Sequence, residues 1–404
     1  MPPPPVVAVD PPAKKKKGKG GGKKPKQTVK PKGRVRARRQ PSKHPLLVAE
    51  LKGHGGIVTC IAASRMSPAV IVTGCEDRKV RAFKCFAERG GVKLDNNALK
   101  LPTGFTAPLK VAVNGDGGKV VALLVEDNAV ASWAIPLPEA LGTPAAGPAR
   151  DLGIWKHNHT SGASALALAS ADAASSATML VRPRPFVVTS DAPKTGVHFW
   201  GLKGKLISKH DTGQIRNRAI ACSSDASYCA VASYLASVQL YKMVRSGGHG
   251  GDDLGASNVR VEKAGALTGF HKKGIIAVAF GCGARAVPYV ATASDDGTWA
   301  VWEVDSRFGE AGVAAPRLVG SGSAPPGHVM TCVALSPDAK LFAAGTAAGA
   351  LVFFRVADGA VVDTINDSHA GVAVRSVVCV PGVRCVASLG EGQTFATVWR
   401  WPAA

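Results

Sequence analysis

Residues Ala291 to Val304 read Ala-Thr-Ala-Ser-Asp-Asp-Gly-Thr-Trp-Ala-Val-Trp-Glu-Val, a pattern that predicts a β-hairpin. The first arm alternates, an Asp-Asp-Gly turn follows, and the second arm carries Trp299 and Trp302. Upstream lie Gly269-Phe270-His271 and the apolar run Ile275 to Phe280. A Gly-x-His opening, two strands, an Asp-bearing turn and a strand ending in an aromatic residue together define one structural repeat.

Six other stretches follow this order with varying fidelity, so we expect seven repeats between Leu46 and Trp401. Their closing aromatic residues recur at intervals of about forty to seventy residues, against ~40–45 in a regular array. Repeats of this kind form four-stranded blades that close into a ring. The fold class we expect is all-β, a seven-bladed β-propeller. The expected closing residues are Phe83, Trp133, Trp200, Tyr241, Trp302, Phe354 and Trp399.

The length beyond a regular repeat lies in four Gly/Ala/Pro/Ser-rich insertions, which we interpret as surface loops. Ring closure also needs one blade that combines both chain ends, because the seam would otherwise expose an unpaired edge strand. Leu46 to Leu51 has a strand pattern and should pair as the outermost strand of the seventh blade. The four insertions are Leu137 to Gly153, Ala163 to Thr178, Ser246 to Asn258 and Ser306 to Pro326.

The chain divides by composition into residues 1–45 and residues 46–404. The first part holds fifteen Lys and Arg residues against the single acid Asp10, and it contains no Phe, Trp or Tyr. It cannot bury enough apolar surface to offset ordering, so we expect a disordered basic arm. Its expected polyanion-binding residues are Lys14, Lys15, Lys16, Lys17, Lys23, Lys24, Arg34, Arg36, Arg38 and Arg39.

Three roles remain open for this arm: a solubilising tail, a nuclear-import signal or a polyanion-binding segment. Without aromatic residues it has no platform for stacking bases, so RNA binding would be non-specific and strongly dependent on salt. Contact with an anionic membrane surface is equally compatible with its charge.

The cysteine spacing indicates the compartment, and the length of the apolar runs indicates the relation to a membrane. The nine cysteines form no Cys-x-x-C pair, which favours reduced thiols and a cytosolic or nuclear setting. No apolar run approaches the ~18–20 residues of a membrane span, so we expect no transmembrane segment. The N-terminus also lacks the apolar core of a secretory signal.

His271, Thr292, Asp296 and Trp302 could be mistaken for a catalytic site, since they include a hydroxyl, an imidazole and a carboxylate. We interpret them instead as a buried structural tetrad that runs from carboxylate through imidazole and hydroxyl to the indole N–H. A second, partial set recurs at His54, Thr73 and Asp77, as a unique nucleophile would not. We expect no enzyme activity, no catalytic residue, no cofactor and no metal site.

Several segments resemble the transducin beta-like proteins of the WD-repeat (WD40) family. They are Trp200 to Lys205, Asp211 to Asn217, the hairpin Ser294 to Val304, and Asp77 to Arg81. The similarity covers about residue 44 to the C-terminus. It implies a WD40 β-propeller that acts as a non-enzymatic scaffold for other proteins.

The resemblance also implies a location and a pathway. Family members are associated with the cytosolic face of the endoplasmic reticulum, with the unfolded-protein response and with a stress kinase as partner. Because a basic arm stands here in place of the hydrophobic anchor of the animal proteins, attachment would be peripheral. The alternative is a nuclear, nucleolar, ribosome-associated or cytoplasmic factor that holds RNA through its arm.

Overall fold

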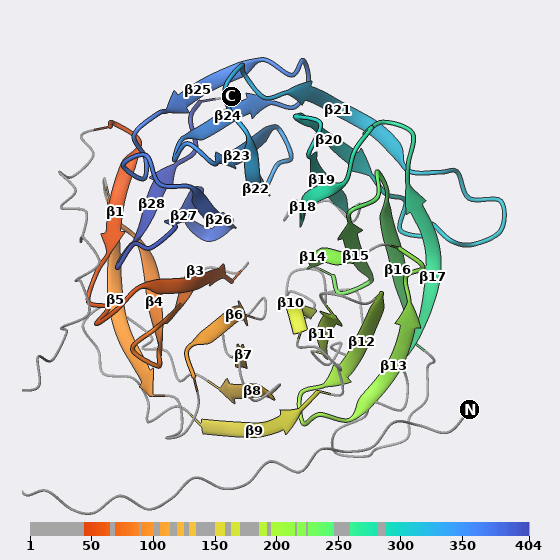
Figure 1. Cartoon of the computed structure of the whole chain (residues 1–404), viewed down its shortest axis with the longest axis horizontal. Coiled ribbons are helices and arrows are strands. Elements are labelled where there is room, and N and C mark those ends of the chain that lie inside the picture. The colour runs from red at the N-terminus through yellow and green to blue at the C-terminus, as the bar shows by residue number, and fades with distance from the viewer. Residues whose placement is uncertain are drawn as a thin grey trace, which may run out of the picture. The chain divides into compact units, whose positions relative to one another are not determined.

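The computed structural model describes residues 44–403, except for residues 65–68, 89–90, 101–105, 114–118, 125–128, 135–149, 158–162, 170–185, 192–194, 215, 224, 246–258 and 282–287. Residues 41–404 form one compact unit (Figure 1). The predicted basic arm, with the ten Lys and Arg residues assigned to it, lies outside the described residues as far as residue 43.

The described residues form strands and one short 3-10 helix, η1 (Pro381–Val383). The strands are β1 (Leu47–Leu51), β2 (Val58–Ala63), β3 (Ala69–Cys75), β4 (Lys79–Glu88), β5 (Gly91–Lys100), β6 (Pro108–Val113), β7 (Lys119–Leu124), β8 (Ala129–Ala134), β9 (Arg150–Lys156), β10 (Ala163–Ala169), β11 (Phe186–Asp191), β12 (Gly196–Gly201), β13 (Leu206–Asp211), β14 (Asn217–Cys222), β15 (Tyr228–Ser233), β16 (Val238–Arg245), β17 (Val259–Leu267), β18 (Ile275–Phe280), β19 (Tyr289–Ser294), β20 (Thr298–Glu303), β21 (Arg317–Ser323), β22 (Met330–Leu335), β23 (Leu341–Thr346), β24 (Leu351–Arg355), β25 (Val361–Ile365), β26 (Val374–Val380), β27 (Cys385–Gly390) and β28 (Ala396–Arg400).

These strands make seven four-stranded antiparallel sheets. The first six take their strands in chain order, from β2–β5 through to β22–β25, and the seventh joins β26, β27 and β28 to β1. The innermost strand of each sheet contacts the innermost strand of the next, and β26 contacts β2 (Figure 1). The predicted all-β propeller is therefore confirmed, and the sheets are its blades.

The pairing of β1 with β28 closes the ring. Leu47 lies opposite Trp399 and Leu51 opposite Ala396, so the start of the propeller supplies the outermost strand of its last blade. The prediction for Leu46 to Leu51 is confirmed within one residue. The chain passes from one blade to the next at one end of the ring, which we name the crossover end. The first and second strands of each blade are joined at the opposite end.

Apolar clusters hold neighbouring blades together. Each of the seven clusters draws its residues from two successive blades, and one of them joins the seventh blade to the first. The predicted closing aromatics all lie on the third strand of a blade, and each belongs to the cluster shared with the preceding blade. They are Phe83, Trp133, Trp200, Tyr241, Trp302, Phe354 and Trp399.

Three of the predicted insertion loops are wrong in part. Ala163 to Ala169 is β10, the innermost strand of the third blade, and Arg317 to Ser323 within the Ser306 to Pro326 stretch is β21, the outermost strand of the fifth. Small alanines suit the crowded centre of the ring, whereas β21 is only partly buried and lacks a strong apolar signal. Residues 150–153 likewise belong to β9, and the Ser246 to Asn258 insertion lies outside the described residues.

The described residues contain no helix whose length and apolar character would let it cross a bilayer.

Glycine at one position on the second strand permits close packing between blades. A Cβ atom on Gly345 of β23 would lie 2.6 Å from Cys332 Sγ and 2.6 Å from Cγ1 of Val374 on the next blade. Gly74 of β3 is placed in the same way against Cys60 and Pro108. Contacts this short cannot be tolerated without movement of the neighbouring strand.

We predict that Gly345→Ala lowers the free energy of unfolding by about 1–3 kcal/mol, because the new methyl group overpacks the interface. Gly196→Ala is the matched control, since its Cβ would meet only His198 Nε2 at 3.7 Å. Chemical denaturation of both variants measures the difference. Equal stability of the two would show that the interface yields to a methyl group.

Candidate functional site

The fifth blade brings the predicted tetrad together around His271. The imidazole Nε2 lies 2.8 Å from Thr292 Oγ1, and the Trp302 indole N–H donates to the same hydroxyl oxygen at 3.2 Å. On the other side, His271 Nδ1 lies 2.8 Å from Thr298 Oγ1, whose hydroxyl donates to Asp296 Oδ1 at 2.5 Å. Thr298, which the sequence analysis did not include, therefore stands between the carboxylate and the imidazole.

The hydrogen-bond partners determine where the protons lie. Because the Thr298 hydroxyl donates to Asp296, it accepts from His271, so Nδ1 carries the proton and Nε2 accepts from Thr292. Burial lowers the pKa of His271, in keeping with a neutral ring. The chain of bonds thus runs in one direction, from the indole N–H to the carboxylate.

Asp296 anchors this chain to the loop between blades. Burial alone would raise the pKa of Asp296, but hydrogen bonds from Thr298 and from the Lys272 and Thr298 backbone N–H groups hold it at about 2. The Lys272 N–H donates to Oδ2 at 2.7 Å. The ionised carboxylate therefore joins the loop before β18 to the turn between β19 and β20.

The first blade holds a variant of the network. His54 Nε2 lies 2.8 Å from Thr73 Oγ1, and Asp77 accepts from the Gly55 N–H at 3.0 Å. Here Arg81 reaches Asp77 with both Nη atoms, at 3.1 and 2.6 Å. Burial first, then the nearby Arg81 charge, lowers the pKa of His54 to about 4, so this imidazole is also neutral at physiological pH.

A third network, in the seventh blade, was missed by the sequence analysis. Ser388 Oγ lies 2.7 Å from His369 Nε2 and accepts from the Trp399 indole at 2.7 Å. Gln393 takes the place of the carboxylate, with Oε1 2.7 Å from His369 Nδ1. The spacing of Ser388 and Trp399, close to that of Thr292 and Trp302, could have indicated this network. It was overlooked because Ser388 and Gln393 replace the expected Thr and Asp.

The geometry gives these hydroxyls no access to a substrate. Thr292, Thr73 and Ser388 are all fully buried. An acyl-transfer nucleophile needs an exposed hydroxyl beside an oxyanion hole. The arrangement is suited to fixing loops against hairpins. Among the residues that the structure describes, His, Cys, Asp and Glu side chains form no group of three able to hold a metal ion.

At the crossover end, the turn between β15 and β16 presents an exposed apolar pair. Tyr234 is 50% exposed and Leu235 is 36% exposed. The turn is held from both sides: the Ile275 N–H of the next blade donates to Leu235 O at 3.2 Å, and buried Gln214 donates to Ser237 O at 3.2 Å. These two side chains are therefore displayed on a fixed turn.

Charged groups extend this patch onto the fifth blade. The Arg218 guanidinium lies 4.4 Å from the centre of the Tyr234 ring and forms an ion pair with Asp295. Val329, 66% exposed, lies in the loop that enters the sixth blade at the same end. Tyr and Arg are the residue types that dominate binding energy in protein interfaces. We name Arg218, Tyr234, Leu235 and Asp295 the crossover patch.

Sequence comparison agrees with this fold. Residues 46–84 match the family model described as "WD domain, G-beta repeat". They contain β1, β2, β3 and the first part of β4, residues 79–84. The ring of blades makes the chain a β-propeller, and this match makes its first repeat similar to the WD repeat.

The chain is also similar to Transducin beta-like protein 2. It is 25% identical over 313 residues to the Mus musculus protein, which covers 75% of this chain and 61% of that protein. For the Homo sapiens protein the identity is 24% over 311 residues, covering 74% and 60%. The predicted resemblance is confirmed. The chain spans about three fifths of the length of these curated relatives.

We predict that Asp296→Ala lowers the free energy of unfolding by about 1–3 kcal/mol, because three donors lose their acceptor. Asp295→Ala, in the same turn, is the matched control; it removes only a surface ion pair, which contributes about 0–1 kcal/mol. Urea denaturation monitored by tryptophan fluorescence compares the two. A loss no larger for Asp296→Ala than for Asp295→Ala would contradict a structural role for the network.

Proposed function

We propose that this protein is a non-enzymatic scaffold that binds partner proteins through the crossover patch. The observation that carries this proposal is an exposed Tyr-Leu pair on a turn that two blades hold in place. An interface gains affinity when its anchoring side chains need little ordering on binding. Arg218, already stacked on Tyr234, adds a charged group whose position is fixed before the partner arrives.

The similarity to Transducin beta-like protein 2 supports a more specific version of this role. As the resemblance implies, the scaffold would act at the cytosolic face of the endoplasmic reticulum in unfolded-protein-response signalling, with a stress kinase among its partners. The basic arm would hold it there by attraction to anionic lipid, at about 1 kcal/mol for each Lys or Arg near the surface.

A second candidate function rests on the same arm. Fifteen Lys and Arg residues without an aromatic residue suit non-specific RNA binding as well as they suit lipid. The protein would then be a nuclear or ribosome-associated factor, with the propeller binding proteins and the arm holding RNA.

We predict that Tyr234→Ala/Leu235→Ser weakens partner binding by about 30-fold or more, as expected when an interface anchor is lost. Affinity purification with quantitative mass spectrometry, followed by titration of each purified partner, measures the effect. Val361→Ser is the matched control, because Val361 is 48% exposed on the outer strand β25. Both variants should have the melting temperature of the unaltered protein. Partners retained equally by both would place the binding surface elsewhere.

We further predict that deleting residues 1–45 abolishes a reticular distribution of the tagged full-length protein. Fluorescence imaging beside a marker of the endoplasmic reticulum tests this. A nucleolar pattern that is lost on the same deletion would instead support the RNA-binding alternative. An unchanged reticular pattern would show that the arm is not the tether.

A further inference from the structure

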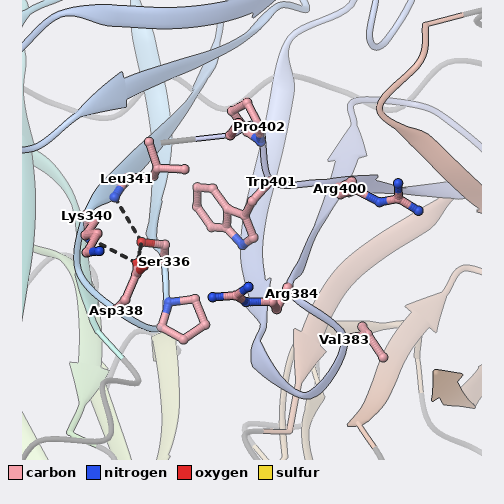
Figure 2. A pocket seen from close by; sticks show the side chains of 11 residues that line it. Ser336, Asp338, Lys340, Leu341, Val383, Arg384, Arg400, Trp401 and Pro402 are labelled. Atoms are coloured by element: carbon pink, nitrogen blue, oxygen red, sulfur yellow. Dashed lines mark hydrogen bonds between the residues drawn. The ribbon is translucent and has the colours of Figure 1, made fainter.

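A cavity of about 580 Å³ lies between the sixth and seventh blades, at the end opposite to the crossover end (Figure 2). Its walls come from the turn between β22 and β23, the turn around η1 and the chain that leaves β28. The volume falls in the range of sites that hold small ligands.

Trp401 forms a fixed apolar wall of this cavity. It is only 8% exposed, and its indole N–H donates to Cys385 O at 3.1 Å. The Trp401 backbone N–H also donates to Arg384 O at 3.3 Å. Pro337 and Pro402 complete the apolar lining. Because the indole is buried against the protein, its face is not free to stack on a nucleotide base.

Three cations line the cavity: Lys340, Arg384 and Arg400. All three are exposed, and within the part of the chain that the structure describes none has a carboxylate within ion-pair distance. Asp338 is the one acid in the lining. Burial would raise its pKa, but hydrogen bonds from the Ser336 hydroxyl and the Lys340 N–H lower it, so the carboxylate is ionised. The cavity therefore carries an excess of two positive charges.

Arg384 holds an unusual backbone conformation at this site. Its φ of 50° and ψ of 44° are left-handed, a region that residues other than glycine rarely adopt. In Figure 2 its side chain extends below the Trp401 ring toward the turn that carries Asp338. The turn that follows Pro381 thus directs a guanidinium into the cavity at a conformational cost.

We propose that this cavity binds a phosphorylated serine or threonine side chain of a partner polypeptide. A phosphate ester carries a charge of about −1.5 to −2 at neutral pH, which matches the excess of two positive charges, whereas a single carboxylate would leave one charge uncompensated. Guanidinium groups bind phosphate through paired N–H bonds.

The remaining lining fits the chain around the phosphate. Asp338 Oδ1 already accepts from Ser336 and Lys340, at 2.6 and 3.2 Å, and its second oxygen can accept from a peptide N–H. Pro337 and Pro402 give an apolar surface for a neighbouring side chain, and the buried Trp401 supports that wall from behind. This site lies at the opposite end from the crossover patch, so it does not depend on the proposed function.

The test titrates the full-length protein with a phosphoserine peptide library with degenerate flanks, the same library after phosphatase treatment, and inorganic phosphate, all at 150 mM salt. Arg384→Gln/Arg400→Gln removes two cations from the cavity. Arg260→Gln/Arg307→Gln is the matched control, because both arginines are highly exposed and lie on other blades. The two variants have equal net charge and the same basic arm, so the arm's contribution cancels.

We expect the phosphorylated library to bind at least tenfold more tightly than its dephosphorylated copy. Arg384→Gln/Arg400→Gln should reduce this binding at least tenfold, and the control should stay within twofold of the unaltered protein. Thermal denaturation confirms that each variant is folded. Equal binding by the two variants would overturn the proposal. A response to inorganic phosphate without a preference for the phosphorylated library would overturn the assignment to a polypeptide.

Discussion

Apolar packing between the faces of neighbouring blades is the interaction on which the whole structure depends. A four-stranded sheet with two apolar faces cannot fold alone, because each face needs a partner. Here every face finds one, through seven clusters that include the contact between the last blade and the first. The aromatic residue on the third strand enters the cluster shared with the preceding blade, as Trp302 does toward the fourth blade. Closure by β1 follows from the same need, because the seventh blade would otherwise lack its outer strand.

The polar networks are secondary to this packing, and their variation shows it. In the fifth blade an unbroken series of hydrogen bonds links Trp302 to Asp296. The seventh blade has the same series, with Ser388 in place of the threonine and Gln393 in place of the aspartate. In the sixth blade Ala344 and Phe354 occupy the positions of the hydroxyl and the indole, yet both are fully buried in the cluster shared with the fifth blade. A blade can therefore dispense with the network but not with the apolar contact. What the network adds is orientation, because the bonds of His271 and of the Lys272 N–H tie a loop at the crossover end to the hairpin of the same blade.

Sequence reasoning recovered the features that local chemistry determines. The closing aromatics, the closing strand and the residues around His271 follow from strand alternation, turn residues and spacing. It failed where residue types alone do not distinguish a strand from a loop: the alanines of β10 were interpreted as an insertion, and the short apolar signal of β21 is followed by Gly and Ser. Thr298 was missed because its role depends on its place between two side chains. The crossover patch and the Arg384 cavity could not be predicted, since each is assembled from segments of separate blades.

The two ends of the propeller present different chemistry, and the topology explains why they can. At the crossover end, Tyr234 and Arg218 lie together at a turn that the Ile275 N–H and the Gln214 side chain hold in place. The opposite end carries the turns between first and second strands, among them the turn around η1 that places Arg384 in the cavity lining. The chain also enters the propeller at this end, where Leu46 O accepts from the Arg400 N–H at 2.8 Å. The crossover patch and the Arg384 cavity therefore lie at opposite ends, so the two proposed partners would not compete for one surface.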